Sequence, residues 1–318
     1  MRTSDAVIGT STQNRTVWQK IKPNIGAYAL FLPVFIYVLI FHYGPMYGIT
    51  LAFRNYLAGD SLFPFAEDVK WIGFDNFVKF FTSLNAVRIF RNTLLINLYS
   101  LLWGFWVPIA FSLLLNEIKH IGYKKTMQTF SYLPYFISTA IIGGLTVSFL
   151  NLNDGFINDI IELFGGARQQ WLSLPEAFKT IYITINIWKG FGWGSILYIA
   201  ALAGVDQSLY ESARIDGANR LQQAWHISLP GMSQTIFILL IFNISGMLGG
   251  EIEVLRLINN PLNAESSATI ALHVYNEGIT RARYGYATAA GFFTSVISFI
   301  LLAVTNKISK ETTEYSLW

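Results

Sequence analysis

The stretch Tyr210–Pro230 reads YESARIDGANRLQQAWHISLP and interrupts a chain that is otherwise strongly apolar. Two acids, two arginines, three amides and a histidine fall within it. Apolar residues recur at helical spacing through its second half, which predicts a helix with one apolar stripe and an opposite polar face. The stripe residues are Ala218, Leu221, Trp225 and Leu229.

Gly217 and Pro230 divide and delimit this stretch. Glycine permits a sharp bend or a left-handed backbone, so we expect two short helices joined at Gly217. Proline lacks the N–H group and restricts the residue before it, so Pro230 either ends the second helix or opens the apolar run that follows. Glu211 and Ser212 fall in the opening turn, where an acid complements the helix dipole. The pattern predicts a rigid, exposed knob that suits a groove on a partner protein.

The same stretch is compatible with an amphipathic helix that lies on the lipid surface. The polar face of such a helix is usually rich in lysine and arginine, whereas this one holds Asn219, Gln222 and Gln223 beside Arg220. The sequence leaves both interpretations open and favours a protein partner.

The composition of the whole chain is that of a membrane protein. Of its 318 residues, 53% are hydrophobic and 13% are charged, against about 25% charged residues in soluble domains. The mean hydropathy is +0.42. The net charge of +3 is too small to indicate nucleic-acid binding. The absence of cysteine excludes disulfides, thiolate metal sites and cysteine nucleophiles.

Six apolar runs are long enough to cross a bilayer, which takes about 20 helical residues. We predict an all-α polytopic fold with spans at about 25–47, 93–115, 130–150, 178–203, 234–255 and 288–305. Pro33 and Pro108 fall inside spans, where neighbouring helices can satisfy the freed backbone groups. The first run begins only near Ile25, so we expect a retained N-terminus rather than a cleaved signal peptide.

The Lys/Arg bias of the short loops predicts the orientation. An even number of spans puts both termini on one side, and eleven of the 22 Lys and Arg residues fall there, so the count alone does not decide. Their clustering beside span ends favours a cytoplasmic N-terminus and C-terminus. These eleven are Arg2, Arg15, Lys20, Lys22, Lys119, Lys124, Lys125, Arg214, Arg220, Lys307 and Lys310. The polar knob then lies in the cytoplasm between spans four and five, and Trp71–Phe81 is a candidate amphipathic helix at the outer interface.

The spacing within the polar stretch resembles the EAA loop of ATP-binding-cassette (ABC) importer permeases. Glu211-Ser212-Ala213, three residues, Gly217, nine residues and Ile227-Ser228-Leu229-Pro230 match that pattern and depart from it only at Ser212, where the family commonly has alanine. The longer LYESARIDGAN is similar to the sugar-importing, maltose-type subgroup. From about Ile25 to the last residue the chain resembles the LplB-like, first-permease branch of complex-oligosaccharide importers. The segments that carry this likeness are GPMYGITLAFRNY, WIGFDNFVKFF, SYLPYFIS, WKGFGWGSILYIAALAG and the terminal SLW.

This resemblance implies one half of a permease heterodimer in the bacterial cytoplasmic (inner) membrane. The implied partners are a second permease subunit, two copies of a cytoplasmic ABC ATPase, and an extracytoplasmic binding protein that delivers an oligosaccharide. The EAA loop is then the helix that couples ATPase closure to movement of the permease helices. The residues assigned to coupling are Glu211, Ser212, Ala213, Arg214, Asp216, Gly217, Ile227, Leu229 and Pro230. For Arg214 and Asp216 a solvated helix face is an equal alternative, since exposed charges contribute little.

No catalytic or metal pattern stands out in the chain. The phosphate-binding loop needs a Gly-Lys pair before Ser or Thr, and no Gly-Lys dipeptide occurs. The four histidines are scattered, and none has a second histidine at ligand spacing. We therefore expect a transport subunit that is not itself an enzyme and binds no cofactor, with ATP and magnesium on the partner ATPase.

Polar residues inside the apolar spans are candidates for the solute path, because in lipid such groups usually face the bundle interior or a wet cavity. Trp188 and Trp193 flank glycines and offer stacking surfaces for sugar, although close helix packing through small residues explains this segment equally well. Lys189 would favour an anionic sugar. The predicted pathway residues are Asn186, Trp188, Lys189, Trp193, Asn243 and Ser245, with Ser195 as a further polar position.

We predict a permease subunit that translocates an oligosaccharide, including a complex or acidic polysaccharide fragment, by alternating access. The alternative is the same machine with a peptide or amino acid as its solute. A membrane enzyme is disfavoured because no cluster of acids or histidines falls at one membrane depth; a channel or scaffold would not depend on the loop. The predicted organisation is a cytoplasmic segment 1–24, a first span and outer loop 25–90, a permease core 91–306 with its EAA loop at 206–230, and a cytoplasmic tail 307–318.

Overall fold

Helices dominate the part of the chain that the computed structural model describes, residues 22–63, 65–66, 69–249, 252–313 and 315–317. Within these ranges no strand occurs, and Arg54 and Trp71 form an isolated antiparallel bridge. The predicted all-α class is therefore confirmed. Contacts divide the chain into two units, Met1–Thr50 and Leu51–Trp318. The segment predicted as a cytoplasmic N-terminus lies almost wholly outside the described residues.

The first unit is dominated by one long apolar helix. It follows a 3-10 turn at Lys22–Asn24 and comprises α2 (Ile25–Val38), a π-helical turn (Leu39–Tyr43), α3 (Gly44–Met46) and a 3-10 segment (Tyr47–Phe53). Together these form 29 residues that are long and apolar enough to cross a membrane. Pro33 is accommodated inside α2. A helix at the first predicted span is confirmed.

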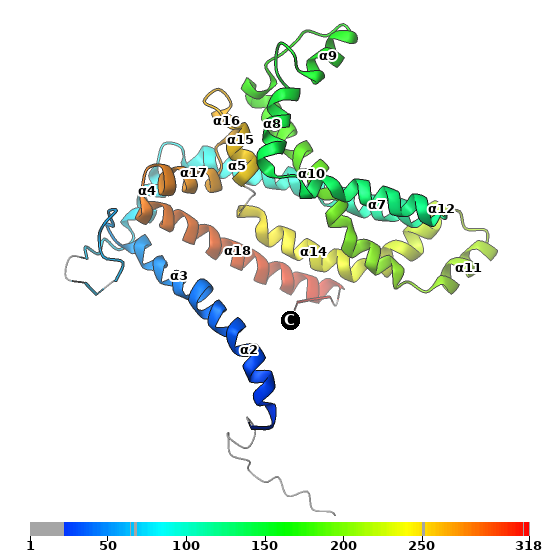
Figure 1. Cartoon of the computed structure of the whole chain (residues 1–318), viewed down its shortest axis with the longest axis horizontal. Coiled ribbons are helices and arrows are strands. Elements are labelled where there is room, and N and C mark those ends of the chain that lie inside the picture. Colours follow the sequence, from blue (N-terminus) through cyan, green and yellow to red (C-terminus); the bar gives the residue numbers. More distant parts are fainter. Residues whose placement is uncertain (1–21, 64, 67–68, 250–251, 314, 318) are drawn as a thin grey trace, which may run out of the picture. The chain divides into compact units, whose positions relative to one another are not determined.

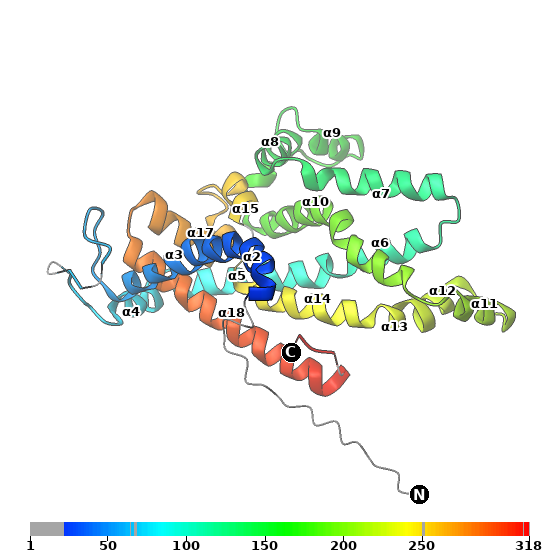
Figure 2. The same cartoon turned by 60° about the horizontal axis from the view of Figure 1, so that its bottom comes forward.

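The second unit contains the remaining helices (Figures 1 and 2). They are α4 (Asp75–Thr82), α5 (Ala86–Tyr99), α6 (Trp106–Asn116), α7 (Ile121–Phe136), α8 (Thr139–Phe149), α9 (Phe156–Leu163), α10 (Pro175–Ala203), α11 (Gln207–Ile215), α12 (Arg220–Gln223), α13 (Leu229–Gly231), α14 (Ser233–Ser245), α15 (Ile252–Ile258), α16 (Ala264–Ser267), α17 (Ile270–Tyr275) and α18 (Tyr284–Thr313). Both views place α11 and α12 at one end of this unit, and α4 and α17 at the opposite end.

The third predicted span is wrong as a single straight helix. α7 and α8 meet at an angle of 94°. The break follows from local chemistry: Ile137 and Ser138 are extended, and the Ser138 hydroxyl accepts a hydrogen bond from the Ile141 N–H, which starts a new helix. A serine N-cap of this kind favours a fresh helix start over continuation.

The fifth predicted span, 234–255, is too long. α14 ends at Ser245 and passes into a 3-10 turn at Gly246–Leu248, and α15 begins separately at Ile252. Gly246 and Gly249 stand at this break, and glycine is unfavourable inside a helix. α15 then packs on α8 and buries Val254, Leu255 and Ile258. The apolar run therefore continues in sequence after the helix has ended.

The described helices include three to five candidate membrane spans by length and composition. Three of them are long and apolar enough to cross a membrane: Ile25–Phe53, Ala86–Asn116 and Tyr284–Thr313. Two bent pairs raise the number to five, Ile121–Phe136 with Thr139–Phe149 and Arg220–Gly231 with Ser233–Leu248. α10 has 29 residues at the fourth predicted span but does not meet the same criterion of apolarity. Six spans with both termini inside stays a prediction.

α10 is the central packing element of the second unit. It contacts α6 and α7 along much of its length, and also touches α5, α14 and α16. Gly192 makes the contact with α7 possible, because a Cβ at that position would lie 2.0 Å from the Ser131 carbonyl oxygen. Small residues let membrane helices approach this closely. Of the glycines near Trp188 and Trp193, Gly192 therefore serves helix packing.

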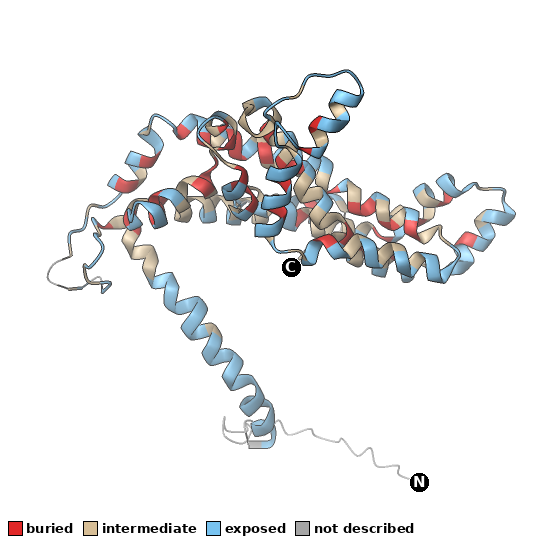
Figure 3. Ribbon diagram, turned by 45° about the horizontal axis from the view of Figure 1, so that its top comes forward, coloured by how far each residue is buried: buried red, intermediate tan, exposed pale blue. Residues whose placement is uncertain are grey.

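Three buried apolar clusters hold these helices together, and two of them contain α10. One joins α5, α10 and α15 around Phe178, and another joins α6, α10 and Met232 around Tyr198. The third joins α4, α5, α17 and α18 around Phe80. Figure 3 shows the consequence, with buried positions on facing sides of packed helices and exposed positions outside. The outer sides carry many exposed Leu, Ile and Phe residues, as expected where lipid is the solvent.

α4 confirms the amphipathic helix expected within Trp71–Phe81. It buries Asn76 and Phe80 and leaves Phe74, Val78 and Phe81 exposed around it.

Candidate functional site

The polar stretch forms the predicted two-helix knob, and Gly217 makes the turn. Gly217 has a φ of 80°. Its N–H donates to the Arg214 carbonyl, and the Ala218 N–H donates to the Ala213 carbonyl at 2.8 Å. This pair of bonds is a Schellman motif, which ends a helix with a left-handed glycine. The glycine predicted as a bend is therefore the C-terminal stop of α11.

Two caps define where the helices of the knob begin. The Asp206 carboxylate accepts a hydrogen bond from the Ser208 N–H at the start of α11, and this backbone bond holds the pKa of Asp206 below its usual value. Asn219 and Gln222 form a capping box, each side chain accepting from the backbone N–H of the other. The capping box satisfies two otherwise unpaired donors. The spacing Asn-x-x-Gln indicates such a capping box, but we did not predict it from the sequence.

The knob is tied internally by buried hydrogen bonds. The hydroxyls of Tyr210 and Ser228 are 2.9 Å apart and both side chains are buried. The Gln223 amide donates to the Ala218 carbonyl at 2.7 Å. The Tyr210–Ser228 bond joins α11 to the second helix, and the Gln223 bond ties the second helix to the connecting loop, so the two halves form one body.

The exposed side of the knob is apolar at several positions. Leu221 is 78% exposed and Ile215 86% exposed, and Leu209 and Trp225 are also exposed. The predicted stripe needs one correction, because Leu229 packs against the cluster of Tyr198 and Met232. Leu229 anchors the knob to the helix bundle, and Leu221 and Trp225 face outward.

The other predicted coupling residues lie around this surface. Pro230 falls in the opening turn of α13, where a missing N–H is tolerated. The helix continues through it from Arg220 to Gly231 and bends by 66° before α14. The second helix therefore continues through Pro230, which lies in the helical turn Leu229–Gly231, and ends at Gly231. Exposed members of the set are Glu211, Ser212, Arg214, Asp216, Gly217 and Pro230, and partly buried ones are Ala213, Ile227 and Leu229.

A cavity of about 560 Å³ lies within the second unit. Three of the predicted pathway residues line it together, Asn186 and Lys189 from α10 and Asn243 from α14. The Lys189 ammonium donates to the Thr139 hydroxyl at 2.9 Å. The Asn186 amide donates to the Tyr182 carbonyl, and its buried Oδ1 atom accepts no hydrogen bond from the residues that the structure describes. The cavity thus offers one cation and one free acceptor.

Trp188, Trp193 and Ser245 are not among the residues that line this cavity. Trp193 instead stacks on Tyr135, with ring centroids 4.6 Å apart and planes 3° from parallel, and Tyr135 is part of the wall. The Ser245 hydroxyl donates to the Phe242 carbonyl of its own helix, and the buried Ser195 hydroxyl donates to Gly192.

Asn97 and Ser100 line the same cavity and were missed. Asn97 is a lone amide in an apolar run, the signal that was applied to Asn243. Ser100 opens a π-helical turn, Ser100–Gly104, between α5 and α6. Such turns are frequent at functional sites, but a sequence does not display them.

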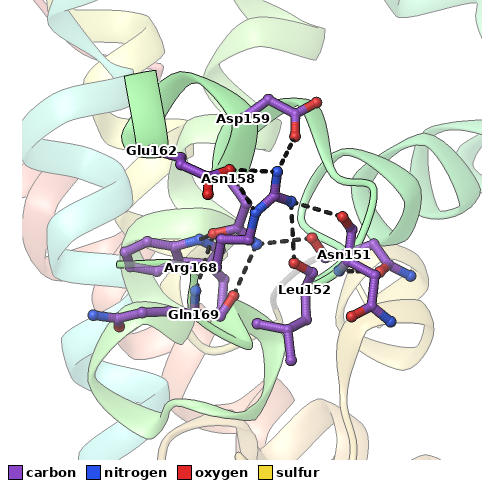
Figure 4. A network of polar contacts seen from close by, with 9 residues as sticks. Asn151, Leu152, Asn158, Asp159, Glu162, Arg168 and Gln169 are labelled. Atoms are coloured by element: carbon purple, nitrogen blue, oxygen red, sulfur yellow. Dashed lines mark hydrogen bonds and ion pairs between the residues drawn. The ribbon is translucent and has the colours of Figure 1, made fainter. Parts of the chain in front are cut away.

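The loop around α9 holds a dense network of polar contacts (Figure 4). Arg168 donates to Asp159, to Glu162 and to the carbonyls of Leu152 and Asn153. The hydrogen bonds to Glu162 and Asp159 raise the pKa of Arg168. The loop is therefore held in one shape.

The same loop contains a fully buried amide. Asn158 donates to the carbonyls of Asn151 and Gln169, and its Oδ1 accepts from the Gln169 N–H and the Trp171 indole. On this framework Leu163 and Phe164 are more than four-fifths exposed.

The terminal tail folds back on the end of α18. The Asn306 side chain accepts from the Leu317 N–H at 2.7 Å, and Ser309 donates to the Tyr315 carbonyl. The Ser233 hydroxyl donates to the Tyr315 hydroxyl at 3.3 Å, which links the tail to the first residue of α14. The last residue of the SLW segment, Trp318, lies outside the described residues.

Residues 122–313 match the family described as binding-protein-dependent transport system inner membrane component. The chain is 38% identical to Protein LplB of Bacillus subtilis (strain 168) over 96% of this chain and 95% of the relative. It is 35% identical to the polygalacturonan/rhamnogalacturonan transport system permease protein YteP of the same organism, over 99% of this chain and 97% of the relative. The chain therefore belongs to this family of permease subunits, and the likeness to the LplB-like branch is confirmed.

Solved structures agree with this assignment. A chain of a bacterial alginate ABC transporter, in complex with an alginate pentasaccharide-bound periplasmic protein, superposes with a TM-score of 0.87 at 38% identity. The match covers 95% of this chain and all of that chain. A second structure, of an ABC transporter involved in the import of the acidic polysaccharide alginate, gives 0.85 at 39% identity. The fold is that of an ABC importer permease, and the chain is a multi-pass protein of the bacterial inner membrane.

Proposed function

We propose that this chain imports an acidic oligosaccharide as one half of a permease pair driven by separate ATPase subunits. The observation that carries the acidic assignment is Lys189, a cation on the wall of a cavity inside a membrane protein. Charges at membrane depth are retained mainly where they serve a path or a ligand. Two kinds of relative support it, one named for polygalacturonan and rhamnogalacturonan and one for alginate.

The partner set follows from the family and from the surfaces of the second unit. The knob of α11 and α12 is the proposed contact for the ATPase, with Leu221 and Trp225 entering its groove. The braced loop around α9, with exposed Leu163 and Phe164, is the proposed contact for the binding protein on the outer side. ATP and magnesium act on the ATPase subunits, and a second permease completes the path.

The proposed mechanism is alternating access. ATPase closure displaces the knob, which moves as one body because Tyr210 and Ser228 tie its halves together. Leu229 packs against the apolar cluster that contains Tyr198 and Leu202 of α10, and the movement thereby passes to the helix that carries Asn186 and Lys189. The cavity then closes on one side of the membrane and opens on the other.

The test is the ATPase activity of the reconstituted complex with its binding protein and a panel of solutes. Acidic oligogalacturonides and oligoalginates should stimulate, and neutral oligosaccharides of equal length should not. Lys189→Gln should raise the half-stimulating concentration about 10- to 100-fold, because a hydrogen bond to a charged group contributes about 1.5–3 kcal/mol. Lys307→Gln, at an exposed position on α18, is the matched control and should behave as wild type.

Equal stimulation by neutral sugars, or an unaffected Lys189→Gln variant, would remove the acidic assignment. Stimulation by peptides or amino acids alone would establish the alternative solute class.

A further inference from the structure

A second recess, of about 780 Å³, lies at the end of the second unit that holds α4 and α17. It is lined by the chain at 54–58, by α4, and by the turn between α17 and α18. It shares no lining residue with the cavity of Asn186, Lys189 and Asn243, called the central cavity below. The charged side chains that line it are Arg54, Lys79, Glu277, Arg281 and Arg283, four cations and one carboxylate.

Arg54 is a buried cation without a counter-ion among the described residues. Its side chain is only 2% exposed, and its two terminal nitrogens donate to the carbonyls of Ser61 and Leu62. Its Nε atom is buried and has no hydrogen-bond partner in the described part of the chain. The guanidinium lies over the ring of Tyr56, 5.8 Å from its centroid. A buried charge is costly unless it is paired, so an incoming anion would supply a counter-charge that Arg54 does not receive from the described residues.

The opposite wall carries two arginines on one carboxylate. Glu277 is buried, and both Arg281 and Arg283 bond to it. The two arginine side chains are 62% and 65% exposed, so each keeps donors free for a ligand. Lys79 pairs with Asp75 at 2.6 Å. With Asp75 included, the described charged residues at the recess carry two positive charges in excess.

The backbone between Arg281 and Arg283 is strained. Ala282, between the two arginines, has a φ of 55°. A non-glycine residue in the left-handed region is strained, and such strain clusters at ligand sites. Here it turns both flanking arginines toward the single carboxylate of Glu277.

The segment that carries Arg54 is fixed just as firmly. The buried Asn76 amide donates to the carbonyls of Ala52 and Arg54 at 3.0 and 3.1 Å. Gly285 packs against the same turn, because a Cβ there would lie 2.9 Å from the Leu51 and Arg54 carbonyl oxygens. The recess is thus built by residues from three distant parts of the sequence.

We propose that this recess is an oxyanion-binding site that takes a carboxylate or phosphate group between Arg54, Arg281 and Arg283. Arginine suits such groups because its planar fork can donate two hydrogen bonds to them. The recess adjoins the first residues of α18, the last long apolar helix. Either a uronate sugar or the headgroup of an anionic lipid brings the required chemistry to this position.

The test is direct binding to the purified permease complex without nucleotide. The probes are trigalacturonate and short-chain phosphatidylglycerol, each compared with a neutral counterpart, maltotriose or short-chain phosphatidylcholine. At least one acidic probe should bind about tenfold tighter than its counterpart at low salt and weaken as salt is added. The probe that binds identifies the source of the oxyanion.

The main variant is Glu277→Gln/Arg281→Gln/Arg283→Gln, which removes the arginines without leaving a buried carboxylate unpaired. It should weaken binding of the acidic probe about tenfold or more. Lys79→Gln, at an exposed site, is the second variant and should weaken it about threefold if the first does not fold. Arg88→Gln, an exposed cation on α5 outside the recess, is the control and should change nothing.

Acidic probes that bind no tighter than neutral ones would overturn the proposal. The proposal would also be overturned if an acidic probe still binds the recess variants but no longer binds the Lys189→Gln variant, since the central cavity would then account for the binding. Binding in this assay does not depend on transport, so its failure is distinct from a failure of the proposed function.

Discussion

Replacing Gly217 by alanine tests whether the knob must keep its shape to couple. Gly217 has a φ of 80°, and a Cβ there would meet no atom within 4 Å. The substitution therefore adds no clash and costs only the strain of a left-handed alanine, about 1–2 kcal/mol. If the ATPase binds the native shape, this strain disfavours the docked form by about 5- to 30-fold. We expect solute-stimulated ATPase activity of the reconstituted complex to fall by that factor.

The chain contains a matched control for this change. Gly165 also has a φ of 80° with open space around it, and it ends α9 through the same pair of bonds, from Gly165 to Glu162 and from Gly166 to Ile161. Gly165→Ala carries the same strain in the loop around α9 and should leave the maximal stimulated rate unchanged at saturating binding protein. Gly217→Pro should abolish stimulation, since proline cannot reach this φ and removes the N–H that bonds to Arg214. Equal rates for Gly217→Ala and Gly165→Ala would refute the coupling role of the turn.

Three further changes have outcomes that the structure specifies. Tyr210→Phe leaves the buried Ser228 hydroxyl without its partner and should lower the free energy of unfolding by about 1–2 kcal/mol; thermal unfolding measures this, and adding Ser228→Ala should restore part of the loss. Gly192→Ala places a Cβ 2.0 Å from the Ser131 carbonyl and should cost about 1–3 kcal/mol by overpacking, whereas Gly144→Ala, with open space, should be tolerated; similar melting temperatures for the two would contradict the packing of α7 on α10. The pKa of Asp206 is lowered by the Ser208 backbone bond, so its cap should stabilise α11 at neutral pH and be lost only as the pH falls below about 4; Asp206→Asn should remove this pH dependence, as followed by hydrogen exchange of the α11 amides.

The knob could be predicted from sequence because its signals are local. Gly217, the helical spacing of Leu221 and Trp225, and Pro230 act within a few residues, and local backbone rules govern them. Leu229 was misplaced for the same reason: the periodicity puts it on the stripe, but tertiary packing against the cluster of Tyr198 and Met232 decides where it faces. Periodicity identifies a face of a helix and does not say what covers it.

The spans were predicted less well where polar side chains restart helices. Hydropathy is continuous through Ser138, yet its hydroxyl begins α8 at 94° to α7. The apolar run at 234–255 likewise conceals the break after Ser245. A window average counts such residues as part of a span, because it does not weigh a single cap or glycine.

The two cavities show more plainly which site residues a sequence reveals and which it does not. Asn186, Lys189 and Asn243 were identified because a polar group in an apolar run is conspicuous, and Asn97 could have been found by the same rule. The recess of Arg54 was beyond reach, because it joins residues from opposite ends of the chain. Glu277 and Arg281 have the i, i+4 spacing of a helical ion pair, which the sequence displays, but the burial of Arg54 leaves no pattern in the sequence.

Cross-linking from the knob tests the central claim most directly. The chain has no cysteine, so Leu221→Cys introduces a unique thiol at an exposed position of the knob. In the assembled complex, a short bifunctional maleimide should join this thiol to the ATPase subunit, and the yield should change between the nucleotide-free and ATP-bound states. Leu163→Cys, equally exposed in the loop around α9, should give no product with the ATPase. Cross-linking from Leu163→Cys instead, or from neither thiol, would contradict the assignment of this knob as the coupling element.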